Sequence, residues 1–109
     1  PTLDGEQMSW RIWDGSTIDL GKKIPEATGE AIDPHTFDAI LVPALRVDRR
    51  GYRLGQGGGY FDRALADLRC WSCALIHPDE ISSIDLPTEP WDVTVRAFAT
   101  PDMISRIKE

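Results

Sequence analysis

The segment with the clearest chemical potential is a glycine-rich stretch, Arg53 to Arg63, with the sequence RLGQGGGYFDR. Its three consecutive glycines, Gly57 to Gly59, remove every side chain just before the residues that are expected to begin a helix. Glycine accepts positive φ angles, so successive backbone N–H groups can point into one concavity. A helix N-terminus adds unpaired N–H groups and a partial positive charge. We therefore expect this stretch to hold phosphate, with Arg53 adding a bidentate contact from the edge of the loop.

Neither of the two common phosphate motifs accounts for this stretch. A P-loop requires a lysine after its last glycine, and the stretch contains none. The dinucleotide-binding pattern G-x-G-x-x-G begins at Gly55 and Gly57 but meets Tyr60 where its third glycine belongs. A structural alternative also stays open, in which the glycines let the loop pack closely against a sheet.

Two aspartates are candidates for a magnesium site beside the loop. Asp62 falls in the first turn of the expected helix, where the helix dipole favours a carboxylate. Mg²⁺ usually takes one or two protein carboxylates together with phosphate oxygens and water, and Asp92 could supply the second. The plainer alternatives are that Asp62 is only a helix-start residue and that Asp92 is only a surface acid at a strand edge.

Charge and composition restrict the classes of function. The chain has 109 residues and a net charge of -6, yet residues 46–69 alone carry +3. A local positive patch on an acidic protein favours one anionic ligand at one place and disfavours nonspecific binding to nucleic acid, although a solvated basic loop is the alternative. No apolar run approaches the length of a membrane span and the first residues show no charged-then-apolar pattern of a signal peptide, so we expect a cytoplasmic protein without a membrane partner. The composition, 41% hydrophobic and 28% charged, predicts a single globular domain over 1–109.

The surrounding pattern predicts an α/β fold. An apolar run over 39–42 that ends at Pro43 is typical of a strand buried on both faces, and so is 71–76. Between them, apolar residues at helical spacing predict a helix over 60–68, which makes a βαβ unit with parallel strands. The remaining expected elements are a weak strand over 8–13, a long loop over 21–34, a loop over 48–59, a strand over 91–99 and a helix from Thr100 to Lys108, with Pro101 at its first position.

The cysteines and histidines carry no strong signal of their own. Cys70 and Cys73 are three residues apart, which on a strand places them on opposite faces, so we expect neither a disulfide nor a shared metal. His35 and His77 have no second histidine or cysteine nearby, so metal binding by either is not expected.

The glycine-rich stretch and its surroundings resemble the 5-formyltetrahydrofolate cyclo-ligase (5,10-methenyltetrahydrofolate synthetase) family. That family has a strand ending in proline, then F-D, a short turn and R-L-G-x-G-x-G-Y-Y-D. Further segments of this chain follow the family order, namely Ile24-Pro25-Glu26-Ala27, Asp38 to Pro43, Val47-Asp48, Leu86-Pro87-Thr88-Glu89, Trp91-Asp92 and Thr100. The likeness extends from about Pro25 to Thr100.

The resemblance implies a fold, an activity and a set of site residues. The fold would be a three-layer Rossmann-like α/β fold with a mostly parallel sheet (NagB/RpiA/CoA transferase-like), incomplete in this chain. The activity would be ATP-dependent ring closure of 5-formyltetrahydrofolate to 5,10-methenyltetrahydrofolate, with Mg²⁺. By residue-wise correspondence, ATP would be bound by Arg53, Leu54, Gly55, Gln56, Gly57, Gly58, Gly59, Tyr60 and Phe61, the folate by Gln56, Gly57, Gly58, Gly59 and Tyr60, and the metal by Asp62 and Asp92; no further catalytic residue is assigned.

Departures from the family pattern keep a second hypothesis open. The histidine of the family's H-D pair is Trp91 here, its glutamine falls at or near His77, and the second aspartate expected after Asp92 is Arg96. The family's N-terminal basic helix and its folate-contacting glutamate have no counterpart, and the chain opens at Pro1. We therefore expect a fragment or processed product that corresponds to the C-terminal portion of such an enzyme and acts with a separate N-terminal segment or by self-association. The alternatives are a noncatalytic nucleotide- or phosphate-binding module, an inactive fragment on the same scaffold and a structural interaction domain.

Overall fold

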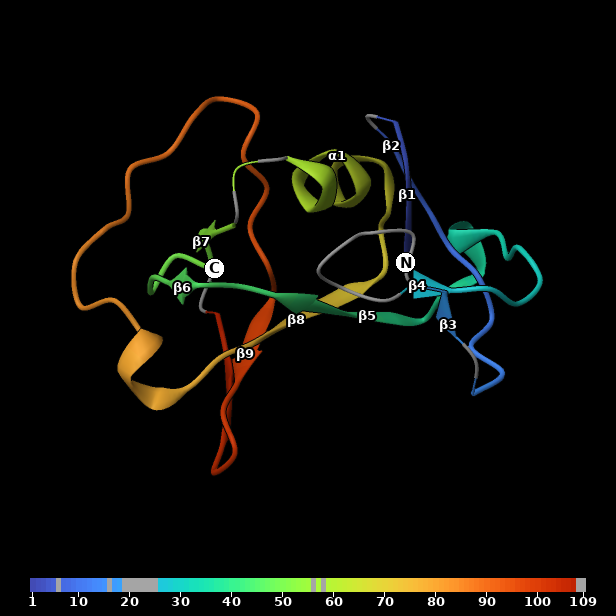
Figure 1. Ribbon diagram of the computed structural model, residues 1–109. Helices are drawn as coiled ribbons and strands as arrows, with labels where there is room; N and C mark the ends of the chain where they lie inside the picture. Colours follow the sequence, from blue (N-terminus) through green and yellow to red (C-terminus); the bar gives the residue numbers. More distant parts are fainter. Residues whose placement is uncertain (6, 16, 19–25, 56, 58, 108–109) are drawn as a thin grey trace. The chain divides into compact units, whose positions relative to one another are not determined.

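The computed structural model describes residues 1–5, 7–15, 17–18, 26–55, 57 and 59–107. By its pattern of internal contacts the chain divides into two compact units, Pro1–Thr36 and Phe37–Glu109. Figure 1 shows the elements of each unit along the chain. All residues of the glycine-rich stretch belong to the second unit.

The first unit consists of short antiparallel pairs. Strand β1 (Thr2–Asp4) pairs with β2 (Gln7–Ser9), β3 (Thr17–Ile18) pairs with β4 (Glu26–Ala27), and a 3₁₀ turn, η1, covers Pro34–Thr36. The strand expected over 8–13 is thus present only at its beginning. The prediction of a loop over 21–34 was wrong at Glu26–Ala27, which form β4. Residues 21–25 of that predicted loop lie outside the described part of the chain.

The second unit contains a four-stranded mixed sheet in the order β10-β9-β8-β5. Strands β5 (Ala39–Pro43), β8 (Trp71–Leu75) and β9 (Ala97–Ala99) are parallel, and β10 (Ile104–Arg106) runs antiparallel to β9. Helix α1 (Tyr60–Asp67) connects β5 to β8 and lies over one face of the sheet (Figure 1). The predicted βαβ unit with its parallel strand pair is therefore confirmed.

The core lies between α1 and the sheet face that it covers. Ile40 and Val42 of β5 are buried there with Leu65 of α1, whereas Leu41, whose side chain points to the other face, is 60% exposed. The prediction that β5 is buried on both faces was thus wrong, because alternate residues of a strand point in opposite directions and α1 covers only one side. In β8 the central residues, Ser72 to Ala74, are buried, as expected.

Two further expectations about elements fail. The loop expected over 48–59 contains a strand, because β6 (Arg46–Val47) and β7 (Arg53–Leu54) form a hairpin. The helix expected from Thr100 is instead a turn into β10. The Thr100 N–H donates to the Met103 carbonyl at 2.9 Å, and the Thr100 hydroxyl oxygen accepts the Asp102 N–H at 3.3 Å. The residue types that cap a helix also close this turn.

The strand expected over 91–99 forms only at Ala97–Ala99, and the preceding residues from Ile81 lack repeating secondary structure after the 3₁₀ turn η2 (Pro78–Glu80). Both cysteines are free, as expected, and burial raises the pKa of Cys73. Among the helices that the structure describes, none has the length and apolarity needed to cross a membrane.

Candidate functional site

A buried aspartate shapes the hairpin that leads into the glycine-rich stretch. The side chain of Asp48 is fully buried, and its Oδ1 accepts the N–H groups of Arg50 at 2.9 Å and Tyr52 at 3.1 Å. Gly51 completes the turn with a φ of 91° and is itself buried. A side chain at Gly51 would meet the Val95 carbonyl oxygen at 2.5 Å, so the turn requires glycine for both its conformation and its close approach.

The other carboxylate oxygen of Asp48 ties this hairpin to a distant loop. Asp48 Oδ2 accepts the Leu86 N–H at 3.0 Å and Arg50 Nη2 at 2.9 Å, and Arg50 Nη2 also donates to the Leu86 carbonyl at 2.9 Å. We refer to Asp48, Arg50 and Leu86 as the Asp48 clamp. Burial acts to raise the pKa of Asp48, but the hydrogen bonds from Leu86, Arg50 and Tyr52 outweigh it and hold that pKa below its ordinary value.

Arg53, the first residue of the glycine-rich stretch, has an almost fully buried side chain, at 4% exposure. Its Nη1 donates to the Pro43 carbonyl at the end of β5 (3.3 Å), and its Nη2 lies 4.0 Å from Asp62 Oδ1. The guanidinium also lies over the Phe61 ring, 5.3 Å from the centroid. Arg53 therefore connects the carboxyl end of β5 to the first turn of α1.

One donor of Arg53 has no partner. The buried Nε makes no hydrogen bond in the described part of the chain. Burial lowers the pKa of the guanidinium, while the charges of Asp62 and Asp92 oppose that effect. Arginine stays charged in proteins, so a buried positive charge with a spare donor lies between the loop and the two candidate metal ligands.

Two of the glycines before α1 adopt positive φ angles, which glycine permits. Gly57 has a φ of 97°, and Gly59, the N-cap of α1, has a φ of 71°. The N–H groups of these two glycines make no hydrogen bond to any other described residue. Gln56 and Gly58, both predicted to bind ATP and folate, lie outside the described residues. Gly57 is exposed, so its amide is accessible to a ligand.

The rest of the predicted nucleotide segment surrounds this turn. Leu54 is 45% exposed, and a side chain at Gly55 would approach Arg53 Nη1 to 3.0 Å. Tyr60 and Phe61 open α1, and the Arg63 guanidinium lies 5.1 Å from the Tyr60 ring centroid. The described part of the predicted segment therefore lies contiguously around the start of α1.

The two predicted metal ligands lie on α1 and on the loop that the Asp48 clamp holds, and these two segments are in contact at Asp62 and Val93. Asp62 is in the first turn of α1, and its Oδ1 lies 3.5 Å from the Val93 N–H, next to Asp92. Asp92 Oδ2 accepts the Glu89 N–H at 2.8 Å. Both carboxylates act electrostatically on Arg53. Asp92 lies in a loop rather than at the start of a strand, and the described residues contain no cluster of three or more metal-binding side chains.

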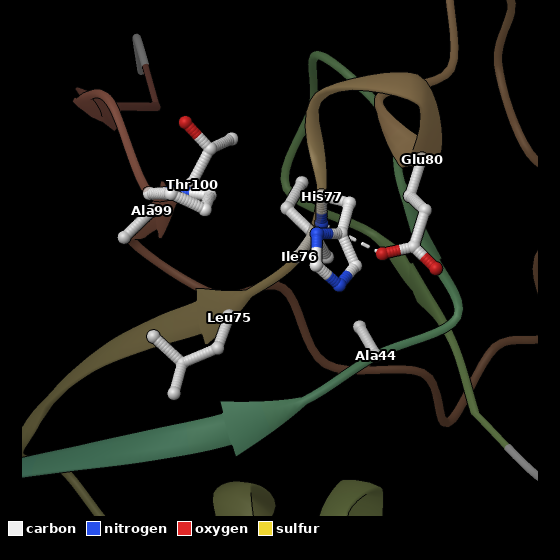
Figure 2. Close-up of a pocket in the computed structure, with 8 residues that line it drawn as sticks. Ala44, Leu75, Ile76, His77, Glu80, Ala99 and Thr100 are labelled. Carbon is white, nitrogen blue, oxygen red and sulfur yellow. Dashed lines mark hydrogen bonds between the residues drawn. The ribbon is translucent and has the colours of Figure 1, made fainter.

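A separate pocket of about 510 Å³ opens at the carboxyl ends of the parallel strands. Figure 2 shows Ala44, Leu75, His77 and Thr100 around it, and the His77 N–H bonded to Glu80 Oε1 at 2.7 Å. Ligands of open α/β sheets bind in this position, and the volume falls within the usual range for small molecules.

Sequence reasoning did not single out this pocket or the Asp48 clamp as parts of a site. The pocket could have been found by marking the residues that directly follow each parallel strand, such as Ala44, His77 and Thr100. The D-x-x-G pattern from Asp48 to Gly51 is typical of a turn closed by an aspartate, but the partner Leu86 is 38 residues away and leaves no local signal.

Comparison with known proteins gives a consistent result. A model of the 5-formyltetrahydrofolate cyclo-ligase family matches residues 4–101. The chain is 44% identical over 78 residues to a 5-formyltetrahydrofolate cyclo-ligase of Mycolicibacterium smegmatis, covering 70% of this chain and 37% of that relative. It is 31% identical over 104 residues to a mitochondrial 5-formyltetrahydrofolate cyclo-ligase of Arabidopsis thaliana, covering 85% and 37% respectively.

Solved structures of the same family also match this chain. A 5,10-methenyltetrahydrofolate synthetase of Aquifex aeolicus matches all of this chain and 57% of its own, with a TM-score of 0.81 and 28% identity. A synthetase of the same name from Mycoplasma pneumoniae matches 69% of this chain and 46% of its own, with a TM-score of 0.60 and 27% identity. The mixed α/β fold is thus shared with these enzymes. The chain spans somewhat more than a third of the length of the curated relatives that it matches.

Proposed function

Because the chain belongs to the 5-formyltetrahydrofolate cyclo-ligase family, we propose that it forms the phosphate-binding part of an ATP-dependent ligase that converts 5-formyltetrahydrofolate to 5,10-methenyltetrahydrofolate. The observation that carries this proposal is the conformation of the glycines before α1. Gly57 and Gly59 adopt positive φ angles, and their N–H groups are not used by the described part of the protein. Amides in this arrangement at a helix N-terminus bind phosphate oxygens.

Arg53 has a different role in this proposal from the one that the sequence predicts. Its buried guanidinium does not reach outward from the edge of the loop. Instead it supplies positive charge from a buried position, where little water screens it, and it holds the end of β5 against the first turn of α1.

Asp62 and Asp92 fit a magnesium site. Mg²⁺ takes one or two carboxylates, with phosphate oxygens and water completing its shell, so two acids beside a phosphate loop are sufficient. When bound, the ion would neutralise charge on the phosphoryl group that is transferred. Arg53 places a positive charge near both acids, and the Asp48 clamp attaches the loop that carries Asp92 to the hairpin.

The reaction requires the protein mainly to position the reacting groups. The formyl oxygen attacks the γ-phosphorus of ATP and ADP leaves; N10 of the folate then attacks the activated formyl carbon, and phosphate leaves as the ring closes. No covalent bond to the protein is needed, so oriented amides and fixed charges are the main catalytic devices. The pocket beside His77 lies at the same edge of the sheet as the end of β5 and offers room for part of the folate.

The test is an assay of the complete gene product with 5-formyltetrahydrofolate, ATP and Mg²⁺, followed by the absorbance of methenyltetrahydrofolate. We expect turnover in the wild type and a loss of at least about a hundredfold in Asp62→Asn, comparable to the loss of one charge-stabilising group. Asp67→Asn, at the other end of α1, is the matched control and should keep its rate.

Binding of Mg-ATP, measured by equilibrium dialysis, separates the possible outcomes. Binding without turnover in the complete protein would support the noncatalytic nucleotide-binding module instead. Absence of both binding and turnover would refute the assignment of the glycine loop, and so would an Asp62→Asn variant that retains the wild-type rate.

A further inference from the structure

Trp91 is a large apolar side chain that the described part of the chain leaves 69% exposed. It directly precedes Asp92, one of the two candidate metal ligands, and it stands where the family pattern has histidine. Neither the core nor the glycine loop uses its ring. Single exposed apolar residues are common on protein surfaces, so a role for Trp91 depends on how its backbone is held and on what lies beside it.

The backbone of Trp91 belongs to a tight turn that is closed twice. The Asp92 N–H donates to the Glu89 carbonyl at 3.0 Å, and the Glu89 N–H donates to Asp92 Oδ2 at 2.8 Å. Pro90, whose ring fixes φ, precedes Trp91 within the turn. The backbone that carries the indole is therefore held before any ligand arrives, and a ligand that contacts the ring has less protein freedom to restrict.

This turn lies near the start of α1. The Val93 N–H, two residues after Trp91, is 3.5 Å from Oδ1 of Asp62 in the first turn of the helix. Gly59, the N-cap of α1, is three residues before Asp62. Figure 1 shows the segment before β9 passing this end of the helix. The turn that carries the exposed indole is therefore a neighbour of the proposed phosphate site.

The two aromatic residues of the glycine-rich stretch already face cations of the protein. The Arg63 guanidinium lies 5.1 Å from the Tyr60 ring centroid, and the Arg53 guanidinium lies 5.3 Å from the Phe61 ring centroid. Both aromatic residues are half-buried, whereas Trp91 is exposed. Trp91 therefore offers a ligand more accessible ring surface than either of them.

We propose that the Trp91 indole stacks on the nucleobase of the nucleotide whose phosphates bind at the glycines before α1. This inference rests on the proposed function, because it takes the positions of the phosphates and of the metal from it. Only the α-phosphate and the ribose separate the metal-bound phosphates from the base, so the base lies in the neighbourhood of Asp92 and Trp91. The glycines supply amides but no apolar surface, whereas an indole presents a flat face on which any base can stack.

Equilibrium dialysis of the complete gene product tests the proposal with two ligands, Mg-ATP and Mg-tripolyphosphate, which has no base. Trp91→Ala should weaken Mg-ATP binding by about five- to a hundredfold, the range for loss of one stacking aromatic side chain. It should change Mg-tripolyphosphate binding by less than about twofold, because the phosphates do not contact the ring. Asp62→Asn, in contrast, should weaken the binding of both ligands.

Two further variants and a spectroscopic signal separate stacking from a structural effect. Trp91→Phe keeps an aromatic ring and should retain most of the affinity for Mg-ATP. Ile84→Ala removes a side chain that is 74% exposed in the same segment and should leave both affinities unchanged. Mg-ATP, but not Mg-tripolyphosphate, should quench the indole fluorescence of the wild type, and Trp91→Phe should remove that quenching.

The outcomes distinguish this inference from the proposed function. If the wild type binds Mg-tripolyphosphate but Trp91→Ala keeps its affinity for Mg-ATP, stacking is refuted and the glycine-loop assignment stands. Equal weakening of both ligands in Trp91→Ala would also refute stacking, because it would indicate a displaced turn. A raised KM for 5-formyltetrahydrofolate with unchanged Mg-ATP binding would refute the choice of the nucleobase. If the wild type binds neither ligand, the proposed function fails and this inference fails with it.

Discussion

Replacing Asp48 by asparagine tests how the site is held together. Asparagine has nearly the same shape, so its Oδ1 can still accept the N–H groups of Arg50 and Tyr52. Its amide nitrogen, however, takes the place of Oδ2, which in the wild type accepts the Leu86 N–H at 3.0 Å and Arg50 Nη2 at 2.9 Å. Donors then face donors at the centre of the Asp48 clamp.

The expected cost follows from the groups left without an acceptor. Loss of the Leu86 N–H bond beside a fully buried side chain costs about 1–3 kcal/mol. The Arg50 guanidinium is 40% exposed and regains water, so its lost bonds add little. We expect Asp48→Asn to lower the free energy of unfolding by about 1–3 kcal/mol, a large share of the total for a small domain.

Urea denaturation followed by circular dichroism measures this loss, with Asp38→Asn, an exposed aspartate, as the matched control. If Asp48→Asn cost less than about 1 kcal/mol, or no more than the control, the reasoning about the clamp would be refuted. In the complete gene product we also expect weaker Mg²⁺ binding, because the loop that carries Asp92 loses its attachment to the hairpin.

The pH dependence of stability tests the same hydrogen bonds of Asp48. Hydrogen bonds hold the pKa of Asp48 below its ordinary value of 3.8, so the unfolded chain binds a proton at this residue more readily than the folded chain does. The stability from Asp48 is therefore fully present above the ordinary pKa and is lost as the pH falls through the folded value. The difference between wild type and Asp48→Asn should be constant near neutral pH and shrink below about pH 4. A difference that grows on acidification would contradict this assignment.

Two further predictions concern Gly51 and the cysteines. Gly51→Ala should lower stability by about 2–4 kcal/mol in thermal melts, because φ is 91° and the new methyl would lie 2.5 Å from the Val95 carbonyl oxygen. Gly57→Ala is the control; its φ is 97° but nothing lies near it, so it should cost only about 1–2 kcal/mol. Equal losses in the two variants would argue against the close approach of Gly51 to Val95. Iodoacetamide should label Cys70 well before Cys73, which is buried and has a raised pKa; equal labelling in peptide mass spectrometry would contradict the fold around β8.

The elements that the sequence predicts well are those with a strong local period. Helix α1 follows from apolar residues at helical spacing, and β5 and β8 follow from short apolar runs between turn signals. The C-terminal helix was wrong because Thr100, Pro101 and Asp102 suit a helix start and a tight turn equally well. Pairing with the edge of β9 decides between these two structures, and such pairing is a long-range effect that local residue types do not encode.

In the candidate site, too, local features were predictable and long-range contacts were not. The positive φ angles of Gly57 and Gly59 agree with the sequence, because glycine is the residue that adopts such angles without strain. The burial of Arg53 was not, because it depends on a carbonyl at the end of β5 and a carboxylate on α1 that meet only in the folded unit. The contact of Asp62 with Val93, the neighbour of Asp92, likewise involves a loop that the Asp48 clamp attaches to the hairpin, and the clamp joins residues 38 positions apart.

Residues 81–96 are attached to the hairpin by a few backbone and side-chain bonds rather than by a strand ladder. Val47 accepts the Ser82 N–H, Asp48 the Leu86 N–H, and Gly51 the Val95 N–H, at 2.8, 3.0 and 2.8 Å. A segment held at so few points can detach at a lower free energy than global unfolding requires. Amide hydrogen exchange should therefore be faster in residues 81–96 than in β8. This segment, with Asp92, would detach and reattach as one cooperative unit while the sheet stays intact.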